Sequence, residues 1–176
     1  AVAAGLVVVV PAGNHRGSEP SHACLYTPAV VPSAITVGAI EENKRASYSN
    51  IGSCVDVFAP GSGYTTASCK SDLGVATGVG TSMAAAHVTG MVAVILGKDK
   101  DLTPPEVLDK LKSEGQSNVI ADKGDGSPNI ALLPSGAGAP GGKEPARTPE
   151  KPADLPDQHI VIHDGFDPNG DGVGTG

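Results

Sequence analysis

The feature that most limits the fold is a long uncharged segment in the middle of the chain. Residues Met83–Leu96 are rich in Ala, Val, Ile and Met and contain no charged side chain. A helix that is apolar on all sides belongs in a protein interior. Gly90 weakens this helix by about 1 kcal/mol relative to Ala, which predicts a close packing contact at that position. We therefore expect a buried central helix.

Three shorter apolar runs are typical of buried strands. Each is bounded by Pro, Gly, Asn or Ser, and continuous apolarity favours strands that are covered on both faces, as in a parallel sheet. The runs are Leu6–Val10, Ala34–Ile40 and Val55–Ala59. Strands that alternate with helices predict an α/β fold with a doubly wound parallel sheet.

A second helix is predicted to begin after Thr103. Thr103 can cap it, Pro104 takes the first helical position, and Glu106 follows three residues after the cap, which is the pattern of a capping box. Its apolar side chains share one face (Val107, Leu108 and Leu111). This helix is amphipathic and belongs at the periphery.

Composition divides the chain at about residue 134. Residues 1–134 alternate apolar runs with turn signals and suffice for one modest core, whereas residues 135–176 are rich in Gly and Pro and are expected to form a tail or linker without fixed structure. Two features of the tail remain open. Ile160–Ile162 could add an edge strand, and the spacing of Asp167, Asn169 and Asp171 imitates the start of a calcium loop that lacks its final Glu.

Charge and hydropathy exclude some partners. The formal net charge of −7 argues against a nucleic-acid surface. No run of about 18 apolar residues predicts a membrane span, and Ala1–Val10 is a poor signal peptide because it lacks a basic start. The chain also begins with Ala, which suggests that it was cut from something longer, although a processed amino terminus is an alternative.

Ser82 is the strongest candidate for chemistry. It lies between the glycine-rich turn Gly78–Gly80 and the apolar helix, near the positive end of a helix dipole and its free backbone N–H groups. Such groups can stabilise an oxyanion, and Gly80 allows a substrate chain to approach closely. The alternative is structural: Thr81 or Ser82 serves only as the cap of the helix.

A longer motif favours chemistry. The string Gly80-Thr81-Ser82-Met83-Ala84, followed by His87-Val88 and Gly90, resembles the serine motif of the subtilases, a family of serine endopeptidases, with Ala86 at the family's proline position. Upstream, Pro11-Ala12-Gly13-Asn14 is similar to the family's Ala-Ala-Gly-Asn segment. The resemblance covers residues 1–134 and is closest to the proteinase K-like branch.

The resemblance implies roles for individual residues. Ser82 would be the nucleophile, and Asn14 would donate a hydrogen bond to the oxyanion. Substrate would lie against Pro11, Ala12, Gly13 and Gly80. The resemblance also implies an acyl-enzyme mechanism on extended polypeptides, no cofactor for the chemistry, and a secreted or vacuolar location.

The histidine and aspartate of the catalytic triad are missing. In subtilases both precede the serine, here by more residues than the chain provides. His87 is five residues after Ser82 on one helix, so the two side chains diverge by about 140°, and we interpret His87 as a satisfied core histidine. His15 and His22 lack the family's context. We therefore expect the isolated chain to be inactive without a missing N-terminal half of the domain; the alternative is a catalytically silent binding or allergenic protein.

Two further features follow from the resemblance. Cys24 and Cys54 match positions that form a disulfide in some proteinase K-like enzymes, which would leave Cys69 free. Asp56 matches a calcium ligand of that branch, and the backbone carbonyls of Pro32 and Ala34 would complete the site. The alternative is an aspartate that merely ends a strand.

Overall fold

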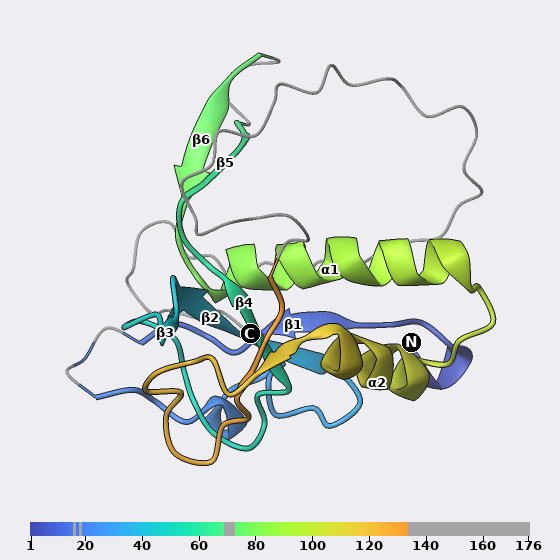
Figure 1. Ribbon diagram of the computed structural model, residues 1–176, viewed down its shortest axis with the longest axis horizontal. Coiled ribbons are helices and arrows are strands. Elements are labelled where there is room, and N and C mark those ends of the chain that lie inside the picture. Colours follow the sequence, from blue (N-terminus) through green and yellow to red (C-terminus); the bar gives the residue numbers. More distant parts are fainter. Residues whose placement is uncertain (16, 18, 69–72, 134–176) are drawn as a thin grey trace, which may run out of the picture.

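The fold is built on a six-stranded, mostly parallel sheet (Figure 1), and the computed structural model describes residues 1–15, 17, 19–68 and 73–133. Four strands lie parallel in the order β1 (Val9–Pro11), β2 (Ile35–Glu41), β4 (Val57–Pro60) and β8 (Ile130–Ala131). Two short strands pair antiparallel: β3 (Lys44–Arg45) with β2, and β7 (Gln116–Ser117) with β8. Each predicted strand is present, shifted by one to three residues, and the α/β class is confirmed.

Two helices and a separate hairpin complete the described chain. Helix α1 (Thr81–Lys98) lies along the sheet, and α2 (Pro104–Glu114) follows it. The hairpin of β5 (Tyr64–Ala67) and β6 (Val75–Gly78) projects away from the sheet (Figure 1). Two short 3-10 turns lie near the start of the chain: η1 (Val2–Ala4) and η2 (Ala23–Leu25).

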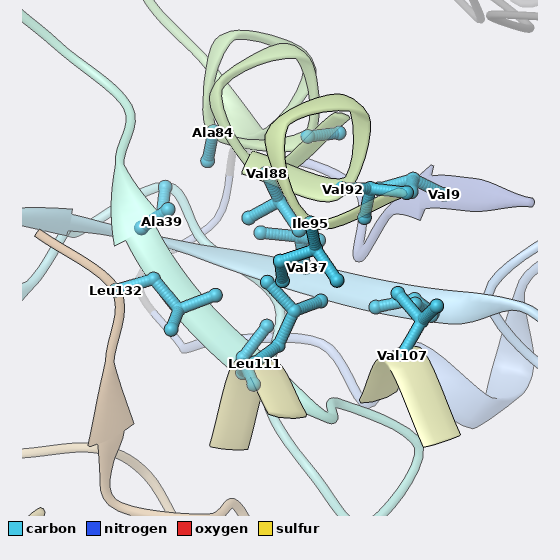
Figure 2. Close-up of a cluster of buried hydrophobic side chains, with 14 of the residues drawn as sticks. Val9, Val37, Ala39, Ala84, Val88, Val92, Ile95, Val107, Leu111 and Leu132 are labelled. Atoms are coloured by element: carbon cyan, nitrogen blue, oxygen red, sulfur yellow. The ribbon is translucent and has the colours of Figure 1, made fainter. Parts of the chain in front are cut away.

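The larger core cluster joins the sheet to both helices. Figure 2 shows Val88, Val92 and Ile95 pointing from α1 towards Val9 and Val37 of the sheet. Helix α2 contributes two fully buried side chains, Val107 and Leu111. Since successive strand residues face opposite sides of a sheet, Ile35, Val37 and Ala39 of β2 all enter this cluster.

A second cluster contains the other face of β2. Its largest member is Phe58, which is fully buried and lies directly over Gly38. A Cβ atom on Gly38 would approach the Phe58 ring to 2.4 Å, so no larger residue fits there without displacing the ring. Residues from η2 and from irregular segments cover this cluster: Ala12, Ala23, Ala29, Val55 and Ile120.

Helix α1 is buried on one face only. Val94 is 59% exposed, and Gly90 is exposed with no atom within 4 Å of a Cβ built there. The predictions of an all-round buried helix and of a close contact at Gly90 are therefore wrong for this chain, because only the face towards the sheet and α2 is covered. Helix α1 is long and apolar enough to cross a membrane, but core helices of soluble proteins also meet these two criteria.

The start of α2 confirms the predicted capping box. Thr103 is the N-cap, Pro104 follows it, and the Glu106 carboxylate accepts hydrogen bonds from the Thr103 backbone N–H at 2.8 Å and hydroxyl at 2.6 Å. These bonds lower the pKa of Glu106. The predictions for Cys69, Ile160–Ile162 and residues 167–171 lie outside the described residues.

Candidate active site

The candidate site lies where the glycine turn becomes helix α1. The N-cap is Gly80, with φ of 149°, so the alternative in which Thr81 or Ser82 serves as the cap of the helix is wrong. Gly80 donates its backbone N–H to the Gly61 carbonyl at 2.9 Å, which fixes the turn against the chain after β4. Ser82 is thereby the second residue of the helix and is partly exposed.

Asn14, at the carboxyl end of β1, reaches the start of this helix. Its side-chain Oδ1 accepts hydrogen bonds from the backbone N–H and the hydroxyl of Thr81, both at 3.0 Å. Gly13 donates its own N–H to the Thr81 hydroxyl at 3.2 Å. Two segments 67 residues apart in sequence are therefore joined one residue before Ser82.

Two hydrogen-bond donors at the start of α1 have no acceptor among the described residues. Because Asn14 uses its oxygen on Thr81, its Nδ2 group is left over, and it has no hydrogen-bond partner within the described part of the chain. No described residue accepts a hydrogen bond from the Ser82 backbone N–H. A Cβ atom on Gly80 would lie 3.0 Å from Asn14 Nδ2, so glycine keeps this donor uncovered. These are the donor types that an oxyanion requires.

The loop that carries Asn14 is held from the opposite side by Tyr48–Asn50. Asn50 donates its side-chain amide to the Ala12 carbonyl and its backbone N–H to the Gly13 carbonyl, both at 3.0 Å. Ala12 also donates to Val37 at 2.8 Å and is fully buried. Of the predicted substrate-lining residues, Ala12 thus has its backbone fully committed within the protein, while Pro11 ends β1 and Gly13 and Gly80 flank Asn14.

A series of hydrogen-bonded side chains that the sequence does not predict leads to the same turn. The Tyr48 hydroxyl hydrogen bonds with the Ser62 hydroxyl at 2.8 Å, and Ser62 donates to the Glu41 carboxylate at 2.5 Å. Burial raises the pKa of Tyr48, and the Glu41 charge acts in the same direction, while hydrogen bonds with Ser62 and the Gly80 backbone oppose them. No local sequence pattern signals this contact, because the three side chains come from separate segments.

His87 is part of the serine motif but differs from the expected satisfied histidine. Its ring stacks on Tyr64 of the hairpin, with centroids 6.0 Å apart, and burial lowers its pKa. Its Nε2 atom is buried without a hydrogen-bond partner among the described residues, so the prediction that it is satisfied is wrong. A helix directs residues 82 and 87 to different sides, which explains why His87 packs against the hairpin.

The predicted calcium ligands and the disulfide lie together, away from the serine. Asp56, Pro32 and Ala34 line one hollow of about 190 Å³, together with Cys54. Cys54 is bonded to Cys24, as the resemblance implied. Asp56 Oδ2 accepts the Thr36 N–H at 2.9 Å, which orients the carboxylate.

Comparisons with known proteins identify the family of the chain. The model of the subtilase family matches residues 1–130. An extracellular serine proteinase of Thermus sp. (strain Rt41A) is 44% identical over 75% of this chain, and a cuticle-degrading serine protease of Arthrobotrys oligospora is 43% identical over 72% of it. Among solved structures, a cold adapted subtilisin-like serine proteinase superimposes with a TM-score of 0.69 at 40% identity, covering 75% of this chain and 46% of that one.

The coverage of the relatives is partial. The chain spans 32% of the Thermus proteinase and 30% of the Arthrobotrys protease, about a third of each. The family match nevertheless takes in most of the described residues, including β1 with Asn14 and the turn with Ser82. The chain belongs to the subtilase family.

Proposed function

We propose that this chain is the nucleophile-bearing part of a serine endopeptidase. The observation that carries the proposal is the pair of hydrogen bonds from Thr81 to Asn14 Oδ1, because they hold the Asn14 side chain against the residue that precedes Ser82 and leave its Nδ2 group without a partner among the described residues. We infer that these two donors serve the Ser82 hydroxyl, since a serine with two such donors suits acyl transfer.

The reaction follows from these positions. The Ser82 oxygen attacks the carbonyl carbon of a peptide bond, and its proton passes to a histidine base. The negative charge on the former carbonyl oxygen is held by Asn14 Nδ2 and the Ser82 N–H. The amine leaves with the proton from the histidine, and water then hydrolyses the acyl-enzyme. An aspartate orients the histidine in this scheme.

We assign that histidine and aspartate to an N-terminal half of the domain. Among the described residues, strand β1 lies at the edge of the sheet, with β2 as its neighbour on one side. A largely apolar hollow of about 410 Å³ lies against β1 and includes Val8, Val10 and Val31. An unpaired strand edge next to apolar surface is a template for another strand. The exposed face of α1 around Gly90 and Val94 is a second surface for the same partner to cover.

The substrates we propose are extended polypeptides, and the protein is proposed to be secreted. The first inference rests on the relatives, which are described as serine proteinases, and the second on the description of one of them as extracellular. The disulfide between Cys24 and Cys54 fits an oxidising compartment. The Pro11–Gly13 segment and Gly80 would line the path of the bound chain.

Peptide hydrolysis tests this function. We expect a protein that joins this chain to its N-terminal half to cleave a denatured polypeptide, and Ser82→Ala to abolish the cleavage. The isolated chain is expected to show none. Absence of hydrolysis by the joined, folded protein would favour the alternative of a catalytically silent binding or allergenic protein.

We also propose a structural calcium ion at Asp56. The fit rests on the shared hollow of Asp56 with Pro32 and Ala34, since calcium accepts carboxylate, carbonyl and water oxygens together. The site offers one carboxylate, and the described residues contain no group of three or more His, Cys, Asp or Glu side chains that could hold a metal. Calcium would support the loop 29–34 and take no part in the chemistry. Titration of Ca²⁺ into the chain should give a binding isotherm that Asp56→Asn removes.

A further inference from the structure

Asp56 already has a cationic neighbour inside the protein. The Lys112 ammonium lies 3.7 Å from Asp56 Oδ1, and the two side chains are 36% and 25% exposed. The other carboxylate oxygen, Oδ2, accepts the Thr36 N–H. The same carboxylate that is proposed to bind calcium is therefore shared with an ammonium group from helix α2.

The position of Lys112 is fixed by the core. It follows Leu111, which is fully buried, and it lies in the last turn of α2. Val107, one turn earlier, is also fully buried, so the helix cannot move away from the sheet without exposing both side chains. The Lys112 backbone therefore stays near Asp56, and only the flexible side chain can swing aside.

We propose that Lys112 is a built-in counter-ion that competes with Ca²⁺ for Asp56. This inference rests on the proposed calcium site. An ammonium at Oδ1 repels a divalent cation that enters the neighbouring hollow. When calcium binds, the Lys112 side chain must therefore either move away or stay close to a like charge, and both cost free energy. In the metal-free chain the same ammonium offsets the carboxylate charge. Lys112 thus lowers calcium affinity and reduces the dependence of stability on calcium.

A pair of lysines on α2 provides a matched experiment. Lys112→Met removes the ammonium beside Asp56, whereas Lys110→Met makes the same change of net charge on an exposed side chain of the same helix. Calorimetric titration with CaCl₂ at low ionic strength should show about three- to tenfold tighter binding for Lys112→Met, as expected for one nearby unit charge in a largely aqueous dielectric. Lys110→Met should stay within about twofold of the parent, because its charge is more distant and screened.

Two additional variants keep the result interpretable. Lys112→Arg retains the positive charge and should bind calcium like the parent chain. Asp56→Asn should remove the binding, which distinguishes this site from any calcium bound by the acidic tail. Thermal unfolding in EDTA and in excess calcium gives an independent readout: the rise in Tm on adding calcium should be larger for Lys112→Met than for the parent.

The results of these titrations distinguish the proposed competition by Lys112 from the proposed calcium site at Asp56. The parent, Lys112→Met and Lys110→Met could bind calcium with equal affinity while Asp56→Asn abolishes the binding. That result would overturn the proposed competition by Lys112 and would leave the calcium site at Asp56 supported. Weaker binding by Lys112→Met would also overturn it. No Asp56-dependent binding in any variant would overturn the calcium site and the competition together.

Discussion

The side-chain oxygen of Asn14 accepts two hydrogen bonds from Thr81, one from the backbone amide and one from the hydroxyl, both at 3.0 Å. This contact joins the carboxyl end of β1 to the first residue of α1. It also determines the orientation of the Asn14 amide, because the oxygen must face Thr81 and the Nδ2 group must face away. The proposed oxyanion donor is thus set in place before any substrate binds.

Replacement of this donor should slow the reaction. In an active protein that contains this chain, Asn14→Ala should lower kcat by about 100- to 1000-fold, a range taken from the loss of an oxyanion donor in a subtilisin and not calculated for this chain. KM should change little, since the charge develops only in the transition state. Asn43→Ala, at an exposed asparagine, is the control. Unchanged kcat in a folded Asn14→Ala protein would remove Asn14 from the mechanism.

The contact between Gly38 and Phe58 predicts a coupled effect on stability. A Cβ on Gly38 would lie 2.4 Å from the ring, so Gly38→Ala should lower the free energy of unfolding by about 1–3 kcal/mol. Phe58→Leu frees space, and the double variant should lose less than the sum of the two single losses. Denaturant unfolding measures all three. Gly97→Ala, within α1 where nothing lies within 4 Å of the new Cβ, should instead stabilise by up to about 1 kcal/mol. Additive losses would contradict the contact.

Burial of His87 predicts a loss of stability in acid. Burial lowers the pKa of the folded imidazole below its usual 6.5. As the pH falls through the usual pKa of 6.5, the imidazole of the unfolded chain becomes protonated while that of the folded chain stays neutral. The free energy of unfolding therefore decreases with falling pH until the pKa of the folded state is passed. His87→Gln should flatten this part of the profile, measured by urea unfolding between about pH 5 and pH 8. His22→Gln keeps His87 and should keep the loss; a profile unchanged by His87→Gln would refute the assignment.

The disulfide should contribute strongly to stability. The bond between Cys24 and Cys54 spans 30 residues, and closing a loop of this length stabilises a protein by about 3–4 kcal/mol through the unfolded state. The double variant Cys24→Ser/Cys54→Ser should lose about this much in denaturant unfolding. Cys69→Ser retains both bonded cysteines and serves as the control. A loss of less than about 1 kcal/mol in the double variant would count against a structural role.

Local signals in the sequence predicted local structure well. The capping box at Thr103 depends on residues three apart, and the strands depend on short apolar runs, so neither requires knowledge of the rest of the fold. Asn14 and Ser82 were found because each lies in a motif specific to one family. The hydrogen bonds between Asn14 and Thr81 could not be predicted from the spacing of residues, since 67 positions separate the two.

The remaining features depend on contacts that a sequence does not encode locally. The apolar composition of α1 predicted burial on all sides, yet burial is decided by what packs on each face, and Val94 is exposed. His87 was expected to be satisfied because buried polar atoms usually are, but its Nε2 faces no described acceptor or donor. The pairing of Lys112 with Asp56 joins a helix to the chain before β4 and has no sequence signature.

Covalent labelling of the proposed nucleophile Ser82 is the decisive measurement. A fluorophosphonate should modify a protein that joins this chain to its N-terminal half once, at Ser82, as located by peptide mass spectrometry, while Ser82→Ala and the isolated chain should remain unlabelled. Labelling of a different serine in that protein, or full labelling of the Ser82→Ala variant, would show that Ser82 is not the nucleophile.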